Sequence, residues 1–156
     1  MTRPGATGVP DPEAVVGAVW PTDGPYSEQR TATAGRAVAE LVRYLNYATR
    51  GVAGLPDPAG AYLLLGSVAT ALQRLPQALD QIARRFAELA ADPAAAIDDL
   101  GHPMGRQSAA AVVGAGLAAA VSGVAAAARH VAAAHTVAGR LYLAGPNGDD
   151  AAGGER

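Results

Sequence analysis

The chain contains no cysteine among its 156 residues. Disulfide bonds, thiolate catalysis and zinc sites with cysteine ligands are therefore excluded. Lysine is also absent, so all 12 basic residues are arginine, and 14 acidic residues leave a formal net charge of −2. Dedicated nucleic-acid-binding proteins usually carry a clear surplus of positive charge. The balance argues against that class but does not exclude a local basic face.

Aromatic residues are scarce: they make up 4% of the chain, whereas hydrophobic residues make up 50%. Much of the hydrophobic content is alanine, which buries little surface, so stability must come from many close contacts. No stretch alternates as a strand would, and apolar residues recur at helical spacing. The sequence predicts an all-α protein, an antiparallel three- to four-helix bundle with a long alanine-rich C-terminal helix and disordered termini.

Proline and glycine divide the chain into three parts. Residues 1–26 contain five prolines and four glycines, which is typical of a flexible N-terminal arm. Residues 27–145 carry the helical bundle, and residues 146–156 follow Gly145 as a disordered tail. The N-terminus shows no signal-peptide pattern, so the cytoplasm is the expected location.

Four helical segments are expected within residues 27–145. Two of them begin with an aspartate followed by a proline. The aspartate can cap the helix, and the proline suits the first helical position because an N–H there would have no partner within the helix. The expected helices cover residues 27–52, 58–89, 93–100 and 104–143. Pro76 lies within the second, which is therefore expected either to kink or to divide into two nearly collinear helices.

Residues 109–128 form a run of twenty residues without a charge, which is long enough to cross a bilayer. Only five of them belong to the strongly inserting types, and the others are alanine, glycine and one serine. We therefore expect a buried packing helix and no association with a membrane. Gly114, Gly116 and Gly123 are expected to let neighbouring helices approach closely.

Three patterns resemble chemical sites, and their spacing argues against each. Residues 114–119 match G-x-G-x-x-A, but they lie inside a helical segment and no acid follows at the required distance. His130 and His135 do not share a helix face as a metal pair requires, so solvated or capping roles are expected. Asp98 and Asp99 point about 100° apart and do not share a proton. We expect no enzyme activity, cofactor or metal.

The most distinctive surface lies on the first long helix. Spacings of four, three, four and three residues place a row of polar side chains on one face: Arg36, Glu40, Arg43, Tyr47 and Arg50, with Tyr44 beside them. We call Arg36, Arg43, Tyr44, Tyr47 and Arg50 the Arg–Tyr stripe. Three interpretations stay open. The stripe is a solvated face with local ion pairs, a surface for an acidic protein partner, or a nucleic-acid surface that holds phosphates and stacks bases.

A resemblance to known proteins rests on three strings, AELVRYLNYATR (39–50), YLLLG (62–66) and LPQALDQ (75–81). Through them the chain resembles uncharacterised short all-helical proteins of Streptomyces and related actinobacteria. The bias toward arginine and alanine agrees with a GC-rich coding sequence. The resemblance implies an all-helical fold in which Tyr44, Asn46 and the break at Pro76 are shared features, and it implies no catalytic residue.

These observations predict a non-enzymatic interaction protein. A thin alanine-rich core favours binding of another protein or a homo-dimer, because pairing buries alanine faces that contribute little within one chain. The alternative is an accessory nucleic-acid-binding protein that uses Arg36, Arg43 and Arg50.

Overall fold

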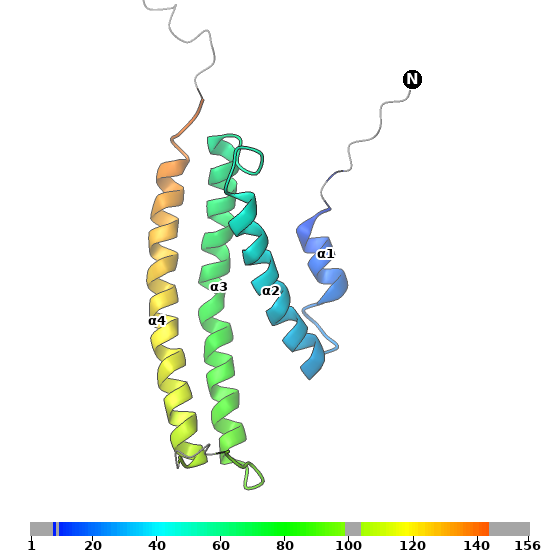
Figure 1. The fold of residues 1–156 in the computed structure, drawn as a ribbon, viewed down its shortest axis with the longest axis vertical. Coiled ribbons are helices and arrows are strands. Elements are labelled where there is room, and N and C mark those ends of the chain that lie inside the picture. The colour runs from blue at the N-terminus through cyan, green and yellow to red at the C-terminus, as the bar shows by residue number, and fades with distance from the viewer. Residues whose placement is uncertain (1–7, 9, 99–103, 144–156) are drawn as a thin grey trace, which may run out of the picture. The chain divides into compact units, whose positions relative to one another are not determined.

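A computed structural model describes residues 8, 10–98 and 104–143 of the chain (Figure 1). The described residues form four α-helices and no strand, so the predicted all-α class is confirmed. The helices are α1 (Pro12–Val19), α2 (Glu28–Ala48), α3 (Pro58–Ala91) and α4 (Arg106–Ala138). The predicted tail, residues 146–156, lies outside the described part. Contacts divide the chain into two compact units with a boundary between Gly54 and Leu55.

The first unit contains α1, a helix of eight residues within the stretch expected to be a flexible arm. Asp11 explains why it forms, because its side chain accepts a hydrogen bond from the backbone N–H of Glu13 at 3.2 Å and Pro12 opens the first turn. The guanidinium of Arg30 donates to the carbonyl of Val19, the last residue of α1. This hydrogen bond ties the end of α1 to the first turn of α2.

The first turn of α2 follows the sequence prediction, since the Ser27 hydroxyl accepts from the Arg30 backbone N–H at 3.2 Å. The helix ends at Ala48, earlier than the expected residue 52. A close approach of the backbone explains the early end. A Cβ on Gly54 would lie 1.9 Å from the Ala48 carbonyl oxygen, so only glycine fits where the chain turns back on the helix.

The second unit contains α3 and α4, which lie side by side in opposite directions and contact each other along their length (Figure 1). Asp57 caps α3 by accepting from the Gly60 backbone N–H at 2.7 Å, as the sequence predicts. Pro76 lies inside α3, which continues as one helix to Ala91. The long alanine-rich helix is confirmed as α4, shorter at both ends than the expected 104–143.

The predicted short helix over residues 93–100 is wrong for its described residues, 93–98, which form a turn and an irregular segment. The Asp92 carboxylate accepts from the Ala94 backbone N–H at 2.8 Å, which closes a local turn in place of a helix cap. The Arg106 guanidinium then donates to three carbonyls of this segment, those of Asp92, Pro93 and Ala95, each at 3.0 Å. An aspartate–proline pair, which begins α3 at residues 57–58, therefore forms a turn at residues 92–93.

The seam between α3 and α4 is built from small side chains. Among the described residues only Ala69 and Ala128 are buried, each 6% exposed. The larger apolar residues of α4 that share the face of Ala128 are half-buried: Val113, Leu117, Val121, Val124 and Val131. The expectation that the alanine-rich helix is buried is therefore wrong, because α3 covers one face of it only.

The apolar character of α4 also meets the length and composition of a membrane span. Its mean hydropathy reaches 1.9 over its most apolar window, and none of that window is buried. Arg106 is its first residue, and Arg129 lies ten residues before its C-cap, Gly139. The absence of membrane association stays a prediction from residue types.

The glycines of α4 do not provide the close contacts expected of them. A Cβ added to Gly114, Gly116 or Gly123 would meet nothing within 4 Å. The close approaches occur instead at Gly66, where a Cβ would lie 3.0 Å from His135 Nε2, and at Gly139, where it would lie 3.1 Å from the Tyr62 ring. The prediction failed because the sequence shows where the glycines occur but does not show which face of α4 packs against α3.

Replacement of Gly116 by alanine is expected to stabilise the protein. Glycine in a helix interior costs roughly 0.8–1 kcal/mol relative to alanine, and the new methyl group enters open space. Urea denaturation should show an increase of about 1 kcal/mol in the free energy of unfolding at an unchanged m-value. Gly123→Ala serves as a second case with the same open surroundings. A loss of stability in both variants would contradict the open face of α4.

Candidate functional site

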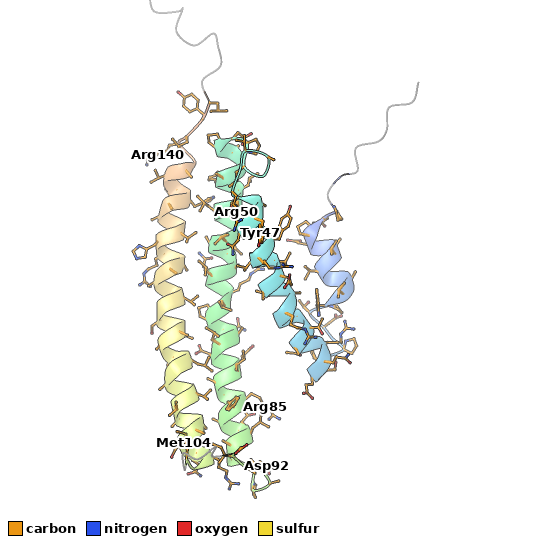
Figure 2. All side chains as sticks on the ribbon, in the orientation of Figure 1. Tyr47, Arg50, Arg85, Asp92, Met104 and Arg140 are labelled. Carbon is orange, nitrogen blue, oxygen red and sulfur yellow. The ribbon has the colours of Figure 1, made fainter. Side chains whose placement is uncertain are left out.

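Four residues of the Arg–Tyr stripe lie on α2 as the spacing predicts, whereas Arg50 lies in the turn after the helix ends, and all five side chains are exposed. Each arginine contacts a residue close to it in sequence. Arg36 donates to Thr33 Oγ1 at 2.9 Å, and Arg43 forms an ion pair with Glu40 at 2.7 Å. The Arg50 guanidinium lies 4.4 Å from the centre of the Tyr47 ring, and these two residues are labelled in Figure 2.

These local contacts favour the interpretation of the stripe as a solvated face. The side chains of Arg43 and Glu40 are 69% and 64% exposed, so their ion pair contributes roughly 0–1 kcal/mol. Arg50 covers one face of the Tyr47 ring, and a base that stacked on this face would first have to displace it. Nucleic-acid binding by the stripe stays a prediction, as does binding of an acidic protein.

The opposite face of α2 is apolar and exposed. Val38 and Leu41 are each 60% exposed and Val42 is 51% exposed. At about 100° per residue this row lies about 180° from the Arg–Tyr stripe around the helix. Their spacing defines one apolar stripe, but within the first unit none of them is buried.

A second exposed apolar row runs along α3. We call it the α3 stripe, and its members recur at alternating spacings of four and three residues: Leu64, Val68, Ala71, Leu75, Ala78, Ile82, Arg85 and Leu89. Leu75, Ile82 and Leu89 are 41%, 51% and 48% exposed. The stripe is centred about 90° around the helix from the seam with α4. This sustained repeat of seven is the pattern by which helices pair in coiled coils.

The apolar residues of α3 recur at helical spacing in the sequence, but they belong to more than one face. Within the second unit α3 has one packed neighbour, α4, which covers only one face of this helix of 34 residues. The face that α4 covers contains Ala69, Leu72 and Pro76, and the α3 stripe remains outside it. The alternation of four and three residues between Leu64 and Leu89 is the signal that would have found the stripe.

His135 was expected to be solvated or to cap a helix, and the structure shows neither role. Its ring stacks on Tyr62 with the ring centres 4.1 Å apart and the planes inclined by 18°. Each ring also covers a glycine of the facing helix, His135 over Gly66 and Tyr62 over Gly139. The two helices therefore interlock through an aromatic residue and a glycine four positions later on each. His130 is exposed, in agreement with the solvated role.

One apolar hollow lies in the second unit, where α3 ends and α4 begins. It has a volume of about 390 Å³ and is lined by Phe86, Leu89 and Ile97 together with Arg106. No group of three or more histidine, aspartate or glutamate side chains in the described ranges is placed to hold a metal ion. Asp99, one of the two adjacent aspartates considered in the sequence, lies outside those ranges. No protein-family model, curated protein or solved structure matches the chain.

Proposed function

We propose that this chain is a non-enzymatic interaction protein that binds a protein partner, or a second copy of itself, by packing of helix against helix. One observation carries the proposal. Three large apolar side chains of α3, Leu75, Ile82 and Leu89, stay 41–51% exposed at intervals of seven residues, whereas the only buried apolar residues of the described part are two alanines. Contiguous exposed apolar surface of this kind marks interaction sites in proteins.

The energetics favour coverage of the α3 stripe. Each 100 Å² of apolar surface removed from water contributes roughly 2.5 kcal/mol. A row that runs from Leu64 to Leu89 is about 38 Å long at 1.5 Å per residue, the length of a typical helix-pairing contact. The apolar face of α2 offers a further surface of the same chemistry, and the Arg–Tyr stripe behind it suits an acidic partner.

A photo-crosslinking amino acid at position 75 tests the proposal in cells of the native host. We expect a covalent adduct of one defined mass from Leu75 in the α3 stripe. The matched control is Gln77, which is exposed on the same helix and lies about 145° around it from the stripe. Mass spectrometry of the adduct identifies the bound protein. Equal adduct formation at both positions, or none at position 75, would contradict the proposal.

A further inference from the structure

We infer that the occupant of the α3 stripe is the α3 stripe of a second copy of this chain, paired in the antiparallel direction. This inference rests on the proposed function and specifies its partner. Three features of the described residues carry it: the order of large and small residues along the stripe, the position of one arginine within it, and the charges beside it.

The order of large and small residues is self-complementary in the antiparallel direction. If two copies of α3 cross with Asp80 at the twofold axis, Ile82 packs against the partner's Ala78. In the same register, Leu89 packs against the partner's Ala71. Both alanines of the stripe then meet a large apolar side chain, and the twofold axis repeats each contact. Alternation of large and small residues across facing positions gives close packing.

Arg85 selects the direction of pairing. It occupies the only charged position of the stripe and forms an ion pair with Glu88 at 2.9 Å. A parallel pairing in register would place Arg85 against its own copy, and like charges that face each other are destabilising. The antiparallel register instead places Arg85 beside the partner's Leu75. Its aliphatic stem can cover this leucine while the guanidinium stays with Glu88 at the rim.

The flanking charges match the same register. Arg74, Gln81 and Glu88 each precede a large residue of the stripe and follow one another at intervals of seven. With Asp80 at the twofold axis, residues on this side of the stripe lie next to residues on the same side of the partner's stripe. The nearest such residue to Gln81 is the partner's Gln81, and the nearest to Arg74 is the partner's Glu88. By symmetry, Glu88 lies next to the partner's Arg74. Arg74 is exposed and has no ion pair among the described residues, which leaves it available. Pairs of opposite charge at these positions determine partner and orientation in coiled coils.

Sedimentation of the full-length chain between 1 and about 100 µM tests the inference, a range that covers affinities typical of self-association. We expect a dimer that Ile82→Asp weakens at least 100-fold, because a carboxylate would replace a central packed side chain. Gln77→Asp adds the same charge outside the stripe and should remain dimeric. Ile82 is 51% exposed in the single chain, so the helical circular dichroism of I82D should match that of the parent.

Charge exchange tests the direction of pairing. Arg74→Glu should weaken the dimer about tenfold, because two attractive contacts become two repulsive ones. Because Glu88 also pairs with Arg85, the rescue variant reverses that charge too: R74E/R85E/E88R restores opposite charges in both contacts and should return the dissociation constant to within about threefold of the parent value. A monomer at all concentrations, a dimer unaffected by I82D, or a triple variant as weak as R74E would each overturn the inference.

The outcome is distinguishable from failure of the proposed function. A monomeric chain that still forms an adduct with another protein from position 75 would remove the second copy and keep the interaction role. A monomeric chain without any adduct would remove both.

Discussion

Ala128→Asp is expected to lower the free energy of unfolding of the second unit by roughly 3–5 kcal/mol, the cost of burying a charge that is not fully paired. Ala128 is 6% exposed, and the seam beside it is lined by Leu72, Pro76 and Ala132 together with Gln73 and Arg129, so the carboxylate would be withdrawn from water. Loss of this magnitude is a large part of the 5–15 kcal/mol that holds a typical domain together. Thermal unfolding followed by circular dichroism measures it.

The matched control is the preceding residue. Ala127→Asp adds the same charge next in sequence, but Ala127 is exposed. It should cost no more than the difference in helix propensity, about 0.7 kcal/mol. Similar losses in the two variants would show that Ala128 does not lie in a packed seam.

Gly66→Val should destabilise the protein by about 1–3 kcal/mol, the usual cost of extra atoms in a packed site. Even the first added carbon would lie 3.0 Å from His135 Nε2. The ring would have to leave its stacked position on Tyr62. Urea denaturation gives the change in stability, and near-ultraviolet circular dichroism of tyrosine reports the loss of stacking.

Gly116→Val provides the comparison for this substitution. Valine has a slightly better helix propensity than glycine, and nothing lies within 4 Å of the position. This variant should gain a few tenths of a kcal/mol. If Gly66→Val were equally well tolerated, the aromatic–glycine interlock between α3 and α4 would have no energetic role.

Local signals in the sequence predict the helices where only neighbouring residues decide. Ser27 and Asp57 cap α2 and α3 as expected, since each bonds a backbone N–H three residues later. The same kind of signal at Asp92 failed because the Arg106 guanidinium binds the carbonyls that a helix would need. A contact between residues 14 positions apart overrides a local preference.

The candidate surfaces were also predictable only in part. The Arg–Tyr stripe could be predicted because it depends on the spacing of residues near one another in sequence. The α3 stripe could not be identified as an exposed surface, because α3 carries two apolar faces and the sequence does not show which one α4 covers. The contact of Tyr62 with His135 joins residues far apart in the chain, and it has no local signal at all.

Tyr62 and His135 lie at the end of the hairpin away from the connection that Arg106 holds. Closure of a loop costs least entropy when the loop is short. Contacts between the two helices are therefore easiest to form at the connected end and hardest to form at the distant end. The same end would fray first in the folded protein, because helix termini open at the lowest free energies. The stacked rings of Tyr62 and His135 thus join α3 to α4 at the end where the hairpin would otherwise open first, so their contact opposes fraying of the seam.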